Sequence, residues 1–305
     1  LKCVFMPPMT VVRPFRWLQA VKKYRATTIG GPNFAFDLCV ERITDEQRQT
    51  LDLSSIRSIV CGAEPIRFAT LQKFAERFAD QGISLDKFNC SYGLAEATLC
   101  VTKGHYTDQT QVSYFDRNSL EKNLAVKVTN SDIDQYGDQA SESESRVVPL
   151  VGCGKSVGGQ ELRIVDSSTL QTLPANQVGE IWVAGPHVAS GYWNRHQLNN
   201  EIFHNQIDTK EFLRTGDLGF LDENGELFVV GRVKDLIIIR GKNYCRQDIE
   251  LACRMASPEL NNSIGAAFSI STENGEALVV VHEISVKDLK VVSPETLSRI
   301  EKACR

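Results

Sequence analysis

The stretch "SIRSIVCGAEPIRFATLQKFAERFADQG" (residues 55–82) joins a short apolar run, a glycine loop and an amphipathic repeat. The apolar run predicts a buried strand, and the loop at Gly62 predicts the turn that ends it. A helix from Pro65 to Asp80 should follow, because apolar side chains recur on one helix face at Phe68, Leu71, Phe74, Ala75 and Phe78. Gly82 is a residue type that commonly ends helices. A strand followed by such a helix indicates an α/β fold, in which ligands bind where strands end.

The same alternation extends on both sides of this stretch. Pro14 begins a helical pattern, and "ATTIGGP" (26–32) predicts a strand that runs into a turn. After residue 150 the pattern is richer in strands, which we expect in "ELRIVD" (161–166), "GEIWVAG" (179–185) and the Asn224-Gly225 hairpin "GFLDENGELFVVGR" (219–232).

A second, smaller unit is expected after Arg232. Its predicted elements are a strand in "DLIIIRG" (235–241), a helix near 247–255, an Asn-Gly hairpin in 269–284 and a last helix after Ser293-Pro294.

Composition excludes several classes of protein. The chain has 305 residues, 42% of them apolar and 24% charged, which is ordinary for a globular protein long enough for two domains. Its net charge of −4 argues against nucleic-acid or polybasic membrane binding. No apolar run approaches the roughly 18 residues of a membrane-spanning helix, and the start lacks a signal-peptide layout. The nine cysteines form no C-x-x-C pair, so we expect reduced thiols in a cytoplasmic protein.

Four short stretches place glycine beside a lone acidic residue at the end of a strand-like run. They are "GAEP" (62–65), "SYGLAEAT" (91–98), "RTGDLG" (214–219) and "GRVKD" (231–235). A different glycine stretch, "GCGKS" (152–156), lacks the G-x-x-x-x-G-K spacing of a phosphate loop, so we interpret it as a turn with an exposed Lys155.

The residue types in these stretches suit a nucleotide and a metal ion. Gly93 permits close backbone approach, Tyr92 offers a flat face to a base, and Glu96 is a hard oxygen ligand suited to Mg²⁺. Asp217 could accept hydrogen bonds from the vicinal hydroxyls of a ribose. The structural alternatives are a helix start with Glu96 in its first turn, and an acid that closes a turn at Asp217.

The stretch "GRVKD" allows two interpretations. Arg232 carries a permanently charged, planar guanidinium group that could contact ribose or phosphate. Lys234 and Asp235 lie where the strand-rich part gives way to the smaller unit. The alternative is a solvated linker between the two parts.

Order and spacing of these stretches resemble those of adenylate-forming enzymes. "GGPNFAFDLC" (30–39), "GAEP", "SYGLAEAT", "RTGDLG" and "GRVKDLIIIRGKNYCRQDIE" (231–250) occur in the order of that family. "RPFRWLQAVKKYRATTIGGPNFAFDLCVERIT" (13–44) and "GAEPI" resemble the fatty acyl-AMP ligases in particular.

The resemblance implies an α/β fold in two domains. Residues 1–232 would be the C-terminal portion of a large adenylation domain, with β-sheets, flanking helices and a β-rich subdomain, and 233–305 the start of a small α+β domain. Residues 104–147 resemble the insertion that marks fatty acyl-AMP ligases and disfavours the use of coenzyme A. The alternative is a surface loop that has merely grown.

The implied reaction converts a fatty acid and ATP, with Mg²⁺, into acyl-AMP and pyrophosphate, before transfer to the phosphopantetheine arm of an acyl carrier protein. By resemblance, Glu96 and Arg232 would be catalytic, with Glu96 holding the metal ion. The nucleotide would be bound by Gly62, Ala63, Glu64, Tyr92, Gly93, Asp217 and Arg232. Asn33 and Phe34 would line the acyl pocket, and Lys234 and Asp235 would form the hinge of the small domain.

The match to the family has departures. Ala95 stands where many relatives carry threonine. The family's phosphate loop and its late catalytic lysine are absent, so we expect a central fragment that alone is weakly active or inactive. The alternative functions are an acyl-CoA ligase and a non-catalytic adenylation-like binding domain.

Overall fold

The computed structural model describes residues 3–4, 6, 12–104, 110–128, 146–239, 242–256, 260, 264–272, 275–283 and 298. The fold is mixed α/β, as predicted. Contacts divide the chain into two compact units, the first made of Leu1–Tyr114 with Pro149–Val230 and the second of Phe115–Val148 with Gly231–Arg305. The second unit therefore includes much of the predicted insertion. The assignment of 1–232 and 233–305 to a large and a small adenylation domain stays a prediction.

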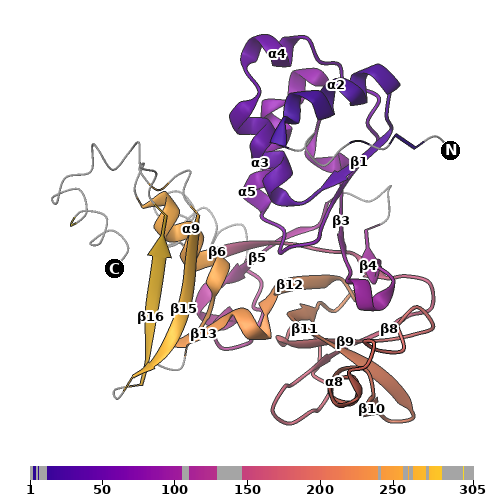
Figure 1. Ribbon diagram of the computed structural model, residues 1–305, viewed down its shortest axis with the longest axis vertical. Helices are drawn as coiled ribbons and strands as arrows, with labels where there is room; N and C mark the ends of the chain where they lie inside the picture. Colours follow the sequence, from indigo (N-terminus) through magenta and orange to yellow (C-terminus); the bar gives the residue numbers. More distant parts are fainter. Residues whose placement is uncertain are drawn as a thin grey trace. The chain divides into compact units, whose positions relative to one another are not determined.

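The first unit contains a sheet with a parallel core, around which several helices pack (Figure 1). Its strands, in spatial order, are β1 (Thr28–Gly31), β2 (Ser58–Cys61), β3 (Phe88–Tyr92), β4 (Thr102–Lys103) and β7 (Lys155–Ser156), and the last two are antiparallel to their neighbours. The α-helices are α2 (Pro14–Tyr24), α3 (Asn33–Arg42), α4 (Asp45–Gln49) and α5 (Phe68–Arg77). The rings of Phe36 and Phe74 pack edge to face at 5.1 Å, and those of Phe36 and Phe88 at 5.6 Å. This aromatic core fixes α3 and α5 against the sheet.

Residues 55–82 fold largely as predicted, with a shorter helix. The expected strand is β2, and the apolar face of α5 is buried at Leu71, Phe74 and Ala75. Phe78 leaves the helical conformation, the short helix η1 (Ala79–Gln81) follows, and Gly82 ends it with φ 94°. The loop before α5 is held by side-chain hydrogen bonds, described below, which delays the start of the helix to Phe68.

A second sheet of the first unit is antiparallel. Its strands are β10 (Asn205–Ile207), β11 (Lys210–Leu221), β9 (Gly179–Ala184) and β8 (Glu161–Val165), with β12 (Leu227–Arg232) paired to β11 and α8 (His196–Ile202) nearby in the chain. The Asn224-Gly225 turn is confirmed, because Gly225 has φ 76° and its N–H donates to the carbonyl of Asp222 at 3.0 Å. Short helical turns η2 (Leu85–Lys87) and η3 (Ala95–Ala97) flank β3.

The described residues of the second unit include antiparallel strand pairs and short helices. Its elements are α6 (Arg117–Leu120), η4 (Val233–Asp235), β13 (Leu236–Ile239), β14 (Lys242–Cys245), α9 (Arg246–Met255), β15 (Gly265–Thr272) and β16 (Gly275–His282). Strands β5 (Val112–Asp116) and β6 (Val147–Val151) pair with each other, and the division between the units crosses both. The predicted helix near 247–255 is confirmed as α9.

Some expectations lie outside the described residues. These are Asn274 of the second hairpin turn, the helix after Ser293-Pro294 and residues 105–109 and 129–145 of the predicted insertion. Among the described helices, none is long and apolar enough to cross a membrane.

Candidate functional site

Two of the predicted nucleotide-binding residues meet in the first unit. The Tyr92 hydroxyl donates a hydrogen bond to Oδ2 of Asp217 at 2.7 Å, although the two residues are 125 positions apart. Tyr92 lies at the end of β3 and Asp217 within β11, and both are buried, with 8% and 5% of their surface exposed. The fold therefore brings "SYGLAEAT" and "RTGDLG" together, as an adenosine site that uses both would require.

Asp217 lies in an irregularity of β11 and does not close a turn before a strand. Arg214 pairs with Trp182 of β9 and Leu218 pairs with Glu180, so residues 215–217 lie opposite Ile181 alone. The Thr215 hydroxyl donates to the carbonyl of Ile181 at 2.7 Å and accepts the N–H of Asp217 at 3.1 Å. Such bulges re-aim side chains and are frequent beside functional sites.

A buried carboxylate stabilises this bulge. Glu180 is only 3% exposed, and its Oε1 accepts the N–H of Gly216 at 3.2 Å. Its Oε2 accepts Nε1 of Trp182 at 3.0 Å and Nε of Arg214 at 3.0 Å. Gly216 has φ 72°, a conformation that glycine adopts most readily. Glu180 is not among the predicted site residues, although an acid inside the otherwise apolar "GEIWVAG" was a usable signal.

Glu96, the predicted metal ligand, is half-buried in η3 and hydrogen-bonded by a tyrosine. The hydroxyl of Tyr192 donates to its Oε1 at 2.6 Å. Burial, followed by this contact with the carboxylate, raises the pKa of Tyr192 to about 12. The backbone joins the same two segments, because the Ala189 N–H donates to the carbonyl of Glu96 at 2.8 Å. The expected helix start at Glu96 is thus a single short turn, and no sequence signal had singled out Tyr192.

The predicted acyl-pocket residues lie at the start of α3, and their side chains differ in exposure. Asn33 is buried, its Nδ2 donates to the carbonyl of Pro65 at 2.8 Å, and its Oδ1 accepts the N–H of Arg67 at 3.1 Å. Phe34 is 52% exposed, and its backbone N–H donates to Oε1 of Glu64 at 3.4 Å. Asn33 therefore fixes the loop after β2, and Phe34 has a face available for a ligand.

The predicted glycines are required by close packing within the protein. A Cβ on Gly93 would lie 1.4 Å from the carbonyl oxygen of Leu99, and one on Gly62 would lie 2.8 Å from that of Ser91. Ala63 has φ 73°, which is strained for an alanine. Contacts of Gly62, Ala63 and Gly93 with a nucleotide stay predictions.

The glycine turn "GCGKS" binds a protein carboxylate. The N–H of Gly154 donates to Oε1 of Glu226 at 2.7 Å, and Gly154 has φ 80°. Lys155 is exposed in β7, as expected. The turn is a structural connection between strands.

The remaining predicted residues belong to the second unit. Arg232 is exposed at the end of β12, and Lys234 is exposed in η4. Asp235 forms an ion pair with Arg246 at 3.2 Å and accepts from Nε2 of Gln247 at 3.2 Å, which ties η4 to the start of α9. The nucleotide contact of Arg232 and the hinge role of Lys234 and Asp235 stay predictions.

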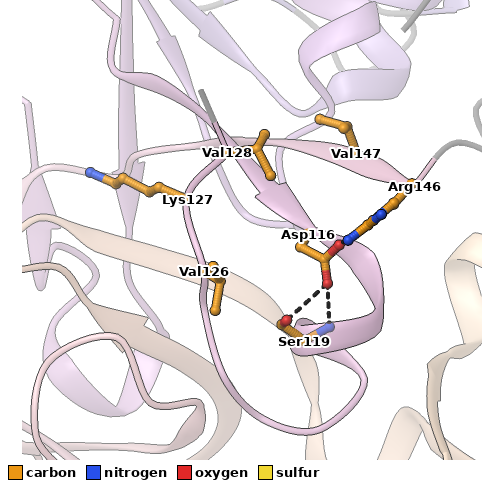
Figure 2. Close-up of a pocket in the computed structure, with 7 residues that line it drawn as sticks. All are labelled: Asp116, Ser119, Val126, Lys127, Val128, Arg146 and Val147. Atoms are coloured by element: carbon orange, nitrogen blue, oxygen red, sulfur yellow. Dashed lines mark hydrogen bonds and ion pairs between the residues drawn. The ribbon is translucent and has the colours of Figure 1, made fainter. Parts of the chain in front are cut away.

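A separate pocket of about 310 Å³ lies in the second unit, within the predicted insertion (Figure 2). Asp116 accepts from the backbone and hydroxyl of Ser119 and forms an ion pair with Nε of Arg146 at 2.8 Å. Val126, Lys127, Val128 and Val147 complete its lining. None of the predicted site residues lines this pocket.

Comparison with known proteins places the chain in a family. Residues 1–193 match the AMP-binding enzyme family. Over 93% of its length the chain is 43% identical to the medium-chain-fatty-acid–[acyl-carrier-protein] ligase JamA of Moorena producens, of which it covers 47%. It is 36% identical over 90% of its length to the putative fatty-acid–CoA ligase FadD21 of Mycobacterium tuberculosis, of which it covers 45%. The chain thus spans about half the length of the curated relatives it matches.

The chain is also similar to solved structures of fatty acyl-adenylate ligases. A structure from a study of fatty acyl-adenylate ligases of E. coli and L. pneumophila aligns with a TM-score of 0.80 and 31% identity, over 97% of this chain and 49% of that one. A fatty acyl-adenylate ligase of L. pneumophila in complex with acyl adenylate and pyrophosphate aligns with a TM-score of 0.70 and 37% identity, over 98% of this chain and 50% of that one.

Proposed function

Because the chain belongs to the family of AMP-binding enzymes, we propose that the protein activates fatty acids with ATP as acyl-AMP and transfers the acyl group to an acyl carrier protein. JamA is named a ligase of medium-chain fatty acids and acyl carrier protein, and the L. pneumophila structure is of a fatty acyl-adenylate ligase in complex with acyl adenylate and pyrophosphate. The observation in this structure that most supports it is the buried hydrogen bond between Tyr92 and Asp217. It joins a flat aromatic side chain and a carboxylate in the first unit.

Asp217 is suited to hold a ribose. A carboxylate only accepts hydrogen bonds, and the vicinal hydroxyls of ribose are donors. Tyr92 orients the carboxylate through its hydroxyl, and in the proposed complex its ring lies beside the adenine. The loop of Gly62, Ala63 and Glu64, with its strained Ala63, forms the other side of the base site.

The carboxylate of Glu96 suits a magnesium ion that is shared with phosphates. Mg²⁺ is usually bound through one or two carboxylates together with phosphate oxygens and water. Glu96 supplies one half-buried carboxylate, and the described residues contain no cluster of three or more His, Cys, Asp or Glu that could form an all-protein cage. When bound, the ion would reduce the negative charge of the triphosphate. Tyr192 holds Glu96 in place through the 2.6 Å hydrogen bond.

The reaction brings two anions together. A carboxylate oxygen of the fatty acid attacks the α-phosphorus of ATP, a P–O bond forms, and the bond to pyrophosphate breaks with its electron pair on the leaving group. The phosphopantetheine thiol later attacks the acyl carbon, a C–S bond forms, the C–O bond to AMP breaks with its electron pair on AMP, and the thiol proton is released to solvent. The protein must mainly position the reactants and balance charge. In this proposal Arg232 contacts the nucleotide, Phe34 lines the acyl chain, and Lys234 and Asp235 form the hinge.

The test uses the full-length protein with ATP, Mg²⁺ and dodecanoate, supplied with either coenzyme A or a phosphopantetheinylated carrier protein, and chromatography of the acyl products. We expect acyl-AMP, its consumption by the carrier protein and its persistence with coenzyme A. Asp217→Asn should lower kcat/KM for ATP about 10- to 100-fold, the loss typical of a hydrogen bond to a charged group. Glu161→Gln, an ion-pair residue at the edge of the same sheet, is the matched control and should retain activity.

A second candidate is an acyl-CoA ligase, because FadD21 carries that name at 36% identity. Efficient formation of acyl-CoA in the same assay would establish it and would refute the preference for a carrier protein. If no acyl-AMP formed while the nucleotide still bound, the non-catalytic binding domain would be the better description. The cytoplasmic location stays a prediction.

A further inference from the structure

We propose that Glu180 is a positioning residue for the nucleotide, acting through the bulge 215–217 on the direction of the Asp217 carboxylate. The inference deepens the proposed function and rests on it, since it assumes that Asp217 binds ribose hydroxyls. Glu180 itself contacts no proposed substrate group.

The contacts of Glu180 converge on the backbone that carries Asp217. Its Oε1 accepts the N–H of Gly216, the residue directly before Asp217. Its Oε2 is held by Nε1 of Trp182, from its own strand, and by the guanidinium of Arg214, from the strand that carries the bulge. The guanidinium also lies over the Trp182 ring, 5.5 Å from the centroid. Glu180 therefore has few alternative orientations, and the peptide before Asp217 is fixed with it.

A regular strand would not present Asp217 in the same way. Residues 215–217 lie opposite a single residue of β9, and Gly216 at φ 72° turns the chain between Thr215 and Asp217. Thr215 anchors one side of this turn to the carbonyl of Ile181, and Glu180 anchors its centre. With both anchors in place, the Asp217 carboxylate comes within 2.7 Å of the Tyr92 hydroxyl.

Stability alone is a weak reason to keep a carboxylate here. Glu180 is 3% exposed in a strand that is otherwise apolar. Replacing buried ion pairs by well-packed apolar residues is often neutral or stabilising. An apolar residue could not accept the N–H of Gly216, so the acceptor is the property that the bulge needs.

The experiment measures binding of ATP and of 2′,3′-dideoxy-ATP to the full-length protein by titration calorimetry. The ratio that reports the ribose-hydroxyl contact alone is the dissociation constant of 2′,3′-dideoxy-ATP divided by that of ATP. Glu180→Gln keeps the shape of the side chain. Its single oxygen, however, cannot accept hydrogen bonds from Gly216 and also from both Trp182 and Arg214. We expect weaker ATP binding by about tenfold, the size of one charge-assisted hydrogen bond, with nearly unchanged dideoxy-ATP binding. The ratio should then approach that of Asp217→Asn, whereas Glu161→Gln should keep the wild-type ratio.

Gly216→Ala provides a second variant in case Glu180→Gln does not fold. A Cβ at this position meets no atom within 4 Å, so the substitution strains only the backbone of the bulge. Gly216→Ala should also lower the ratio, by a smaller factor than Glu180→Gln does.

The outcomes separate the two proposals. If Asp217→Asn lowers the ratio but Glu180→Gln and Gly216→Ala leave it at the wild-type value, Glu180 is merely structural and the inference is overturned. If the wild-type protein binds both nucleotides equally, the ribose role of Asp217 is wrong, and the inference that rests on it is also overturned. A fall in the ratio for all three variants supports both.

Discussion

Two carboxylate–arginine pairs in the molecule have similar geometry and different surroundings. The Nε–O distance is 3.0 Å between Arg214 and Glu180 in the first unit and 2.8 Å between Arg146 and Asp116 in the second. The side chains of Glu180 and Arg214 are 4% and 31% exposed, and those of Asp116 and Arg146 are 11% and 57% exposed. Since water screens the second pair far more, distance alone is a poor guide to the energy of an ion pair.

The two pairs also stabilise different local structures. Glu180 binds the N–H of a glycine with positive φ inside a bulge. Asp116 caps α6, accepting the N–H and hydroxyl of Ser119 at 2.9 and 2.8 Å. An N-cap can be formed by several residue types, whereas the acceptor at Gly216 comes from a residue on the neighbouring strand. We therefore expect the first pair to tolerate substitution less well.

The largest effect should come from Glu180→Gln. It leaves Arg214 without its carboxylate beside a buried tryptophan, and breaking such a pair costs about 2–4 kcal/mol of unfolding free energy after allowance for the partial exposure of Arg214. Urea denaturation of the full-length protein measures this loss. Glu161→Gln, whose partners Lys210 and Arg163 are 61% and 43% exposed, should cost less than about 1 kcal/mol. Equal losses for the two variants would show that burial of the carboxylate and its partners does not determine the cost of breaking an ion pair.

Asp116→Asn should have a smaller effect. Asparagine is as good an N-cap as aspartate, so the variant loses mainly the ion pair with a largely exposed Arg146. We expect a loss of about 1 kcal/mol or less, measured by the same denaturation. Arg146→Gln is the control and should cost a similar amount. A loss as large as that of Glu180→Gln would show that exposure does not separate the pairs.

The smallest effect concerns pH. The hydrogen bond from Arg146, followed by those from Ser119, lowers the pKa of Asp116. A carboxyl group with a lowered folded-state pKa stabilises the fold above its unfolded pKa of about 3.9. This stabilisation is lost as the pH falls from there through the folded-state pKa. Denaturation at pH 7, 5, 4 and 3 should therefore show the cost of Asp116→Asn fall toward zero at the acid end, and a constant cost would contradict this assignment.

Sequence reasoning found the local elements because their causes are local. The periodicity of α5, the β2 strand and the Asn224-Gly225 turn depend on neighbouring residues, and all three were predicted. The start of α5 was placed too early because Asn33, from a distant helix, occupies the carbonyl of Pro65 and the N–H of Arg67. Contacts over such sequence distances leave no periodic pattern.

The candidate site was predicted in part for the same reason. The motifs named Tyr92, Glu96 and Asp217, and the structure brings Tyr92 and Asp217 together. The partners that orient them, Glu180 and Tyr192, were missed because their importance depends on strand register and loop packing. The adenine, ribose and metal contacts stay predictions.

The hydrogen bond between Tyr92 and Asp217 also bears on how the protein matures during synthesis. Its two residues are 125 positions apart, so at about 5–20 residues per second the carboxylate is made roughly 6 to 25 seconds after the hydroxyl. The parallel strands β1 to β3 precede Asp217 in the chain and can pair before it has been made. A nucleotide stabilises a protein only by binding its folded form. Nucleotide bound as proposed can therefore assist folding only after both halves of its site have left the ribosome.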